Sequence, residues 1–235
     1  MERYSFYRQI AAEALGTALL VATVIGSGIM GDALSPDDAV TLLANTIATG
    51  AILVVLITVL GPISGAHFNP AVTMAFALKR SISPRPAMAY VAAQFAGGLL
   101  GAIAAHIMFD QPALQVSTHI RSGVGQWWSE IVATFGLVGV ILSGIRFRAA
   151  AIPWLVGLYI TAAYWFTAST SFANPAVAFA RAFTESFAGI RPADLPGFFL
   201  AELAGSVAAL TLFGWLLQPL PRAAATNDAI ATGAE

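Results

Sequence analysis

The sequence contains no cysteine, and only 10% of its 235 residues carry a charge. The absence of cysteine excludes disulfide bonds, thiolate metal sites and nucleophilic thiols. A net charge of −1 leaves no basic surface for a nucleic acid. The chain is instead 58% hydrophobic, with a mean hydropathy of +0.78. This composition predicts a helical protein embedded in a lipid bilayer.

Six nearly uncharged stretches are long enough to cross a bilayer, which takes about 20 helical residues. We expect these spans at residues 6–30, 40–60, 84–109, 127–146, 150–168 and 196–218. The first is too long for the apolar core of a signal peptide, about 7–15 residues, so we expect it to be retained. The last residues, about 220–235, have no apolar periodicity and are expected to be disordered.

Two Asn-Pro-Ala tripeptides begin at Asn69 and Asn174, 105 residues apart. Each opens an apolar segment, 69–80 or 174–183, that is too short to span. Twelve helical residues cover about 18 Å of a hydrocarbon core about 30 Å thick. Asparagine is a favoured N-cap and proline a favoured first residue. We therefore expect two half-helices whose positive ends meet near the midplane, where they would repel cations.

The two halves of the chain match each other. Glu13 opens Glu-Ala-Leu-Gly-Thr in the first span, and Glu130 opens Glu-Ile-Val-Ala-Thr in the fourth. Each half, about 6–109 and 127–218, holds three spans, so the second must be inverted relative to the first. Eight Lys and Arg residues (Arg3, Arg8, Lys79, Arg80, Arg85, Arg146, Arg148 and Arg222) then fall on one side, against Arg121, Arg181 and Arg191 on the other. This bias predicts cytoplasmic N- and C-termini.

The run Ser-Gly-Ala-His-Phe-Asn-Pro-Ala-Val-Thr at 64–73, the second tripeptide, the two glutamates and Ala93-Gln94 resemble the major intrinsic protein family, the aquaporins and aquaglyceroporins. The resemblance covers the chain except its two tails. It implies one all-α membrane channel domain over 1–235, with six transmembrane helices and two re-entrant half-helices in an inverted repeat. It also implies a homotetramer with a pore in each subunit, which passes water or small uncharged solutes. No enzyme activity, cofactor or metal is expected.

In that family an arginine normally follows the second Asn-Pro-Ala and forms part of a four-residue constriction; here the position is Val177. The other constriction positions correspond to Thr49, Ser171 and, in the fifth span, either Ala162 or Tyr164. Water-selective members resemble a set of an aromatic residue, a histidine and the arginine. Glycerol-conducting members carry two aromatic residues, a glycine and the arginine. This set resembles neither.

Valine in place of arginine removes five donors and a positive charge, and should widen the aperture. The tract around the second tripeptide also resembles that of a bacterial branch associated with arsenic detoxification. We therefore predict a passive channel in the bacterial inner membrane for polyols and for metalloid hydroxides such as arsenite. The expected substrates include methylated arsenicals. The alternatives are a general water and glycerol facilitator, a gradient-coupled secondary transporter, and a membrane enzyme that uses Glu13 and Glu130.

Four further residues have two interpretations each. Glu13 and Glu130 either relay protons or accept backbone N–H groups from the pore loops. Arg181 shares a helix face with Asn174 and Val177, so it either lines an outer vestibule or reaches lipid headgroups or Glu185. His67 is expected at the inner vestibule, where it either packs or responds to protonation. The three histidines are too scattered for a metal site.

Overall fold

The structure, a computed structural model, describes residues 4–219, and all its regular elements within that range are helical. They are α1 (Phe6–Leu34), α2 (Asp38–Ser64), α3 (Pro70–Leu78), α4 (Pro84–Met108), α5 (Val124–Phe147), α6 (Ile152–Phe166), α7 (Pro175–Arg181) and α8 (Leu195–Leu216). Short 3-10 turns, Ala149–Ala151 and Pro192–Asp194, lead into α6 and α8. Within residues 4–219, six helices are long and apolar enough to cross a membrane, α6 being counted with the turn before it, which confirms the six predicted spans. The tail expected to be disordered lies outside the described residues.

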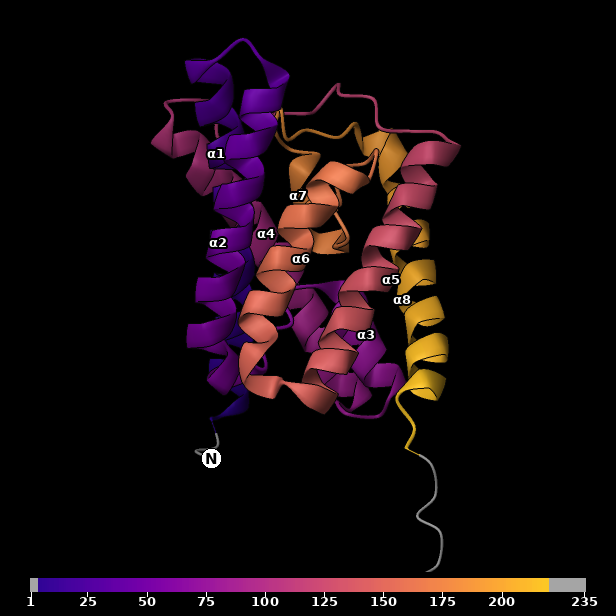
Figure 1. The fold of residues 1–235 in the computed structure, drawn as a ribbon. Helices are drawn as coiled ribbons and strands as arrows, with labels where there is room; N and C mark the ends of the chain where they lie inside the picture. The colour runs from indigo at the N-terminus through magenta and orange to yellow at the C-terminus, as the bar shows by residue number, and fades with distance from the viewer. Residues whose placement is uncertain (1–3, 220–235) are drawn as a thin grey trace, which may run out of the picture.

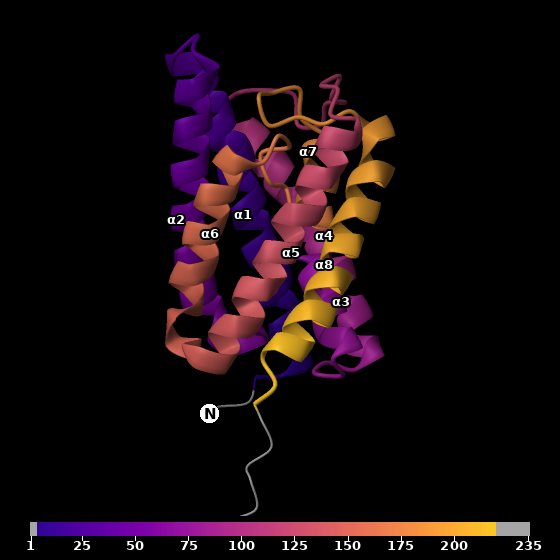
Figure 2. The same cartoon turned by 45° about the vertical axis from the view of Figure 1, so that its right-hand side comes forward.

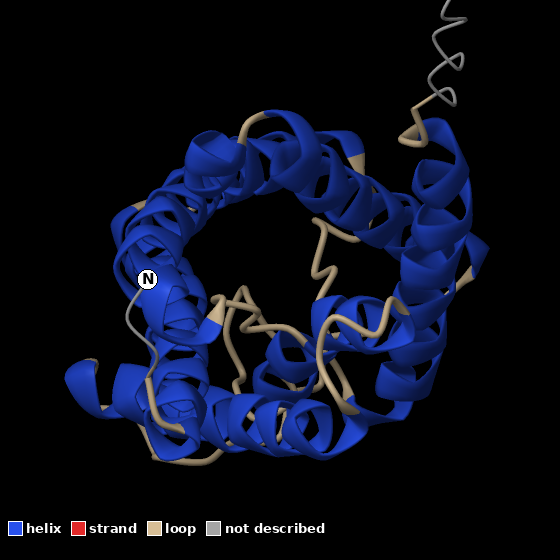
Figure 3. Cartoon of the chain, turned by 90° about the horizontal axis from the view of Figure 1, so that it is seen from below, coloured by secondary structure: helices blue, strands red, loops and turns tan. Residues whose placement is uncertain are grey.

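The six long helices run side by side, and the two short ones lie at opposite ends of the molecule (Figure 1). In this view α7 lies near the top and α3 near the bottom, and Figure 2 shows the same separation after rotation. The described chain begins and ends at the bottom, which we call the termini end; the other is the far end. From below, the long helices form a ring around the two short helices and their loops (Figure 3).

The order of elements repeats: long, long, short, long in α1–α4, and again in α5–α8. The packing repeats as well, because α1 packs along α2 and α4 while α5 packs along α6 and α8. The short helices approach the interior from opposite ends. The fold is therefore the inverted repeat with two re-entrant half-helices that the sequence predicts.

Both half-helices end about two residues earlier than expected. Helix α3 has nine residues and α7 has seven, so each is only about 10–14 Å long. After α3, Arg80 adopts a positive φ of 58°, which ends the helix. After α7, the Phe183 N–H bonds to Ala180 O, a tighter turn than an α-helix makes. Neither helix can cross a bilayer.

Small residues bring α1 and α4 together. A Cβ atom added at Gly97 or Gly101 would overlap the carbonyl oxygen of Ala14 or Ala18 on α1. The two backbones can therefore approach closely only because α4 carries glycine at both positions. This contact holds α4 along α1, where Gln94 Nε2 donates to Glu13 Oε2 at 2.8 Å.

Candidate functional site

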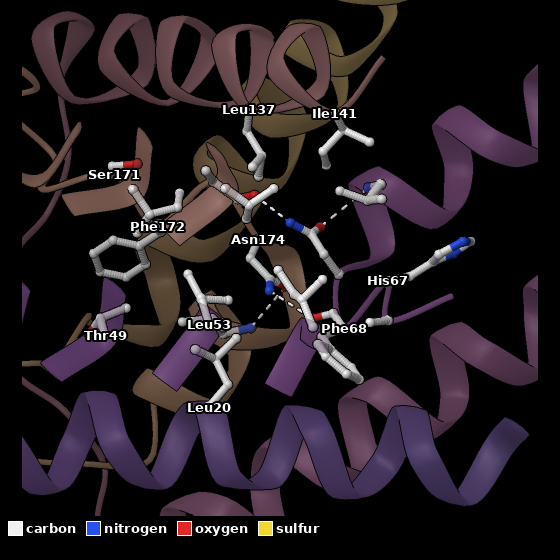
Figure 4. Close-up of a pocket in the computed structure, with 18 of the residues that line it drawn as sticks. Leu20, Thr49, Leu53, His67, Phe68, Leu137, Ile141, Ser171, Phe172 and Asn174 are labelled. Atoms are coloured by element: carbon white, nitrogen blue, oxygen red, sulfur yellow. Dashed lines mark hydrogen bonds between the residues drawn. The ribbon is translucent and has the colours of Figure 1, made fainter. Parts of the chain in front are cut away.

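A cavity of about 120 Å³ lies between the two halves of the chain, with room for several water molecules. Much of its wall is apolar and comes from four long helices: Leu20 and Val24 of α1, Leu53 and Ile57 of α2, Leu137, Ile141 and Ile145 of α5, and Ile152, Val156 and Ile160 of α6. Figure 4 shows Leu137 and Ile141 on one side of this space and Leu20 and Leu53 on the other. Much of its polar lining comes from the loops that lead into α3 and α7.

Asn69 and Asn174 begin the two half-helices at the wall of this cavity. The side-chain oxygen of Asn69 accepts the Ala71 N–H at 2.8 Å, and that of Asn174 accepts the Ala176 N–H at 3.0 Å. This is N-cap geometry, and the intervening proline has no N–H to leave unpaired. The positive ends of both half-helices are therefore placed at the cavity.

The two asparagines also bond across the interface between the halves. Asn69 Nδ2 donates to Ala173 O at 2.7 Å, and Asn174 Nδ2 donates to Phe68 O at 2.8 Å. Each carbonyl belongs to the residue before the other asparagine. Because an amide nitrogen carries two hydrogens, each asparagine retains one N–H that can serve the contents of the cavity.

Glu13 of α1 holds the first loop. Its carboxylate accepts the N–H groups of His67 at 3.0 Å and Phe68 at 2.7 Å. It also accepts hydrogen bonds from Ser64 Oγ at 2.6 Å and from Gln94 Nε2 at 2.8 Å. Phe68 has a φ of 48°, which a bulky residue rarely adopts. Four hydrogen bonds to one buried carboxylate stabilise this strained loop.

Two carboxyl groups hold the second loop. Glu130 of α5 accepts the N–H groups of Phe172 at 2.9 Å and Ala173 at 2.7 Å. Glu202 of α8 accepts the N–H of Asn174 at 2.9 Å. Ala173 has the same φ as its counterpart in the first loop, 48°. Both carboxyl groups are fully buried and lie outside the cavity wall.

Tyr164 lines the cavity, and Ala162 does not. The side of α6 that faces the cavity is defined by residues four apart, Ile152, Val156, Ile160 and Tyr164. Ala162 lies two residues away from this series, about 200° around the helix, and it is exposed on the outer surface. The expectation that Ala162 lines the pore is therefore wrong.

The other three expected constriction residues lie together on the same cavity. Thr49 Oγ1 is 3.2 Å from the hydroxyl of Tyr164. Ser171 Oγ is buried and has no hydrogen-bond partner among residues 4–219. Val177 is 5% exposed and presents no donor. This part of the cavity wall thus carries hydroxyl groups and an apolar side chain.

Arg181 lies in the cavity wall, at the far end of α7. Its guanidinium carbon is 3.4 Å from the centroid of the Phe172 ring, and its Nε–H donates to Ala188 O. Glu185 instead accepts the N–H and hydroxyl of Thr118, at 2.6 and 2.5 Å. The interpretation in which Arg181 reaches headgroups or Glu185 is wrong, because the side chain folds inward onto an aromatic ring.

His67 lies on the cavity wall in the first loop. Its Nδ1 is 3.1 Å from Thr73 Oγ1, and its ring packs against Phe76 and Tyr90, with centroids 4.7 and 5.4 Å away. Its ring is thus held on three sides. Within residues 4–219, no three His, Asp or Glu side chains are grouped closely enough to hold a metal ion.

From the sequence, Phe172 has no predicted role, and Glu202 is only one of three membrane carboxylates that a gradient-coupled transporter could use. A signal for Glu202 was present, because it lies in the last span of its half, as Gln94 does in the first. Aligning the two inverted halves at that span would have placed both beside a pore loop. No comparable pattern identified Phe172, because its contact with Arg181 depends on how two loops fold.

A ring of six spans around two re-entrant half-helices, with polar loops lining a cavity at their junction, defines a membrane channel. Comparison with known proteins agrees. The model of the major intrinsic protein family matches residues 1–148. Aquaglyceroporin AqpS of Rhizobium meliloti (strain 1021) is 65% identical over 219 residues, which are 93% of this chain and 94% of the relative.

The chain therefore belongs to the major intrinsic protein family, and it is a channel of the aquaglyceroporin type. Aquaporin NIP1-1 of Arabidopsis thaliana is 35% identical over 164 residues, 66% of this chain and 54% of the plant protein. The solved structure of the aquaglyceroporin from Plasmodium falciparum superposes with a TM-score of 0.71 over 91% of this chain and 96% of that one. At 22% identity that likeness shows the fold.

Proposed function

We propose that this channel passes polyols and metalloid hydroxides such as arsenite and methylated arsenicals, in addition to water, down their gradients. The observation that carries the proposal is Val177, which lines the cavity where the family normally has an arginine. An isopropyl group is shorter than a guanidinium side chain and leaves a wider, less charged opening. Arsenite near pH 7 is the neutral As(OH)3, a compact solute rich in hydroxyl groups.

The rest of the constriction suits such a solute. Ser171, Thr49 and Tyr164 all line the cavity, and the hydroxyl groups of Thr49 and Tyr164 lie within hydrogen-bond distance of each other. The amides of Asn69 and Asn174 each retain an N–H. A hydroxylated molecule can therefore exchange its water for these groups one at a time while its remaining surface slides along the apolar wall.

A general water and glycerol facilitator is the second candidate, and the solute panel below separates the two. A gradient-coupled transporter would need an ionisable site open to the pathway. Glu13, Glu130 and Glu202 are fully buried, bonded to the loops, and absent from the cavity wall. This arrangement supports a passive channel. We further propose a homotetramer in the bacterial inner membrane, with the termini end in the cytoplasm.

Stopped-flow swelling and shrinking of proteoliposomes, with water, glycerol, urea and arsenite in turn, tests the proposal. We expect non-saturating flux of glycerol and arsenite that an uncoupler does not change. Flux of water and glycerol without arsenite would favour the general facilitator. Saturable uptake that collapses with the uncoupler would favour a transporter.

A further inference from the structure

Arg181 is a buried cation that makes no ion pair within residues 4–219. Only 2% of its surface is exposed, yet its side chain lies on the cavity wall. Its Nη1 atom is buried and has no hydrogen-bond partner in the described part of the chain. The ion pair between Arg191 and Asp194 is the only salt bridge found between residues 4 and 219. The buried carboxyl groups of Glu130 and Glu202 act on Arg181 only from beyond ion-pair distance.

A second arginine adds to this charge. The guanidinium carbon of Arg121 is 5.2 Å from the centroid of the same Phe172 ring that Arg181 covers. Arg121 donates to Phe187 O and Gly189 O, while Arg181 donates to Ala188 O between them. Three successive carbonyl groups thus hold two guanidinium groups at one ring. Two positive charges therefore meet at the Phe172 ring, and Arg181 is the one that lines the cavity.

A buried cation that keeps an unpaired N–H is unfavourable unless something supplies an acceptor. The carbonyl of Ala188 and the face of Phe172 supply only part of the stabilisation that water would give the guanidinium group. Arg181 is also one of the residues that line the cavity, so its positive charge acts on whatever occupies the far mouth.

We propose that Arg181 is the charge-selecting residue of this channel, set one helical turn beyond Val177. It excludes cations from the far mouth and donates to the oxygen atoms of an entering neutral solute. This inference rests on the proposed function as a pore for uncharged solutes. In this pore, width and charge are then controlled separately: Val177 leaves the opening wide, and Arg181, about 6 Å along the axis of α7, keeps it closed to cations.

The test compares full-length wild type with Arg181→Gln and Arg181→Lys in proteoliposomes that contain a pH-sensitive dye and a sodium indicator. We expect Arg181→Gln to raise proton and sodium leak about tenfold or more, because a nearby positive charge is lost. Arg181→Lys should keep the leak low and reduce glycerol flux, since an ammonium cannot present a planar fork. Arg191→Gln is the matched control and should leave both measurements unchanged, because Arg191 lies off the cavity wall and pairs with Asp194.

If Arg181→Gln leaks protons and sodium no faster than wild type, with its glycerol flux intact, the inference is overturned. Equal leaks in the Gln and Lys variants would also overturn it, because they would indicate a structural role only. If Arg181→Gln does not assemble, Phe172→Leu is measured instead; it removes the ring that positions the guanidinium and should raise the leak several-fold, and no rise would refute the idea. Absence of solute flux in wild type would refute the proposed function, whereas the leak comparison would still decide the role of Arg181.

Discussion

Gln94 and Glu202 occupy equivalent places in the two halves of the channel. Gln94 on α4 donates to Glu13, which holds the first pore loop. Glu202 on α8 accepts the N–H of Asn174, next to the Phe172 and Ala173 N–H groups that Glu130 accepts in the second loop. The second half thus uses another carboxyl group where the first half uses an amide.

This correspondence predicts that Glu202→Gln is nearly neutral. A glutamine could still accept the Asn174 N–H with its oxygen, and its nitrogen would replace Oε2, which has no hydrogen-bond partner among residues 4–219. We expect a change in stability of less than about 1 kcal/mol, measured as the thermal unfolding of detergent-solubilised protein, and an unchanged glycerol flux. Glu202→Ala, the comparison variant, should cost about 1–3 kcal/mol, because it leaves the buried Asn174 N–H without a partner. Equal losses in both variants would contradict this correspondence between Gln94 and Glu202.

Glu13→Gln should be much more harmful than Glu202→Gln. The Glu13 carboxylate accepts four hydrogen bonds, including one from the side-chain nitrogen of Gln94. A glutamine would turn one accepting atom into a donor that faces those groups. We expect a loss of about 3 kcal/mol in stability, seen as a lower melting temperature and a lower yield of folded protein. A melting temperature equal to that of wild type would show that the loop does not need this carboxylate.

Val177→Arg should convert the channel towards water selectivity. The longer side chain would fill the opening, so glycerol and arsenite flux should fall at least about tenfold. Water flux should fall less, because water is the smallest of these solutes. Val177→Thr, which keeps the size of the side chain, is the control and should retain the solute profile. If Val177→Arg passes glycerol as wild type does, the constriction lies elsewhere.

Tyr164→Phe should increase polyol flux. The change removes a hydroxyl from the cavity wall and frees Thr49 Oγ1, which lies 3.2 Å away, to bond the solute. One hydrogen bond of about 1 kcal/mol corresponds to a change of about fivefold in glycerol flux. Thr49→Val lacks the freed hydroxyl and should show no such increase, and adding it to Tyr164→Phe should cancel the gain. A double variant as fast as Tyr164→Phe would argue for a purely steric effect.

Glu185 should make the far-end loops sensitive to acid. Hydrogen bonds from the Thr118 hydroxyl and N–H lower the pKa of the exposed Glu185 carboxyl below its ordinary value of 4.5. Because the folded-state pKa is lowered, the hydrogen bonds between Thr118 and Glu185 stabilise the loops above pH 4.5. This stabilisation is lost as pH falls through the folded-state pKa. The melting temperatures of wild type and Glu185→Gln should therefore differ by a constant amount from about pH 5.5 to 8. A difference that persists undiminished at pH 3 would contradict this account.

The positions of the spans and half-helices follow from local sequence, which is why they could be predicted. Hydrophobic length sets the spans, and Asn69 and Asn174 mark the half-helix starts through capping chemistry. The placement of Thr49, Ser171 and Val177 on one cavity came from the family resemblance. The choice between Ala162 and Tyr164 could not be made, because it depends on the rotation of α6 about its own axis.

Arg181 shows why the rest of the site could not be predicted from the sequence. Its helix face could be deduced from its spacing to Asn174, but not the direction of a long, flexible side chain. That direction is set by Phe172 and Ala188, which lie on loops on either side of α7. Loop conformations held by positive φ angles, such as 52° at Ser171, leave no periodic pattern in the sequence.

The hydrogen bonds that the Asn69 and Asn174 side chains make across the two halves affect how the channel is assembled. Asn69 bonds to Ala173, a residue synthesised 104 positions later. A nascent chain that has inserted only its first three spans carries an incomplete loop, and the ribosome must finish nearly three quarters of the polypeptide before that loop is secured. Maturation of the conduit is therefore a late, concerted event of biogenesis, and a truncated product ending before the second tripeptide would hold no lumen of its own.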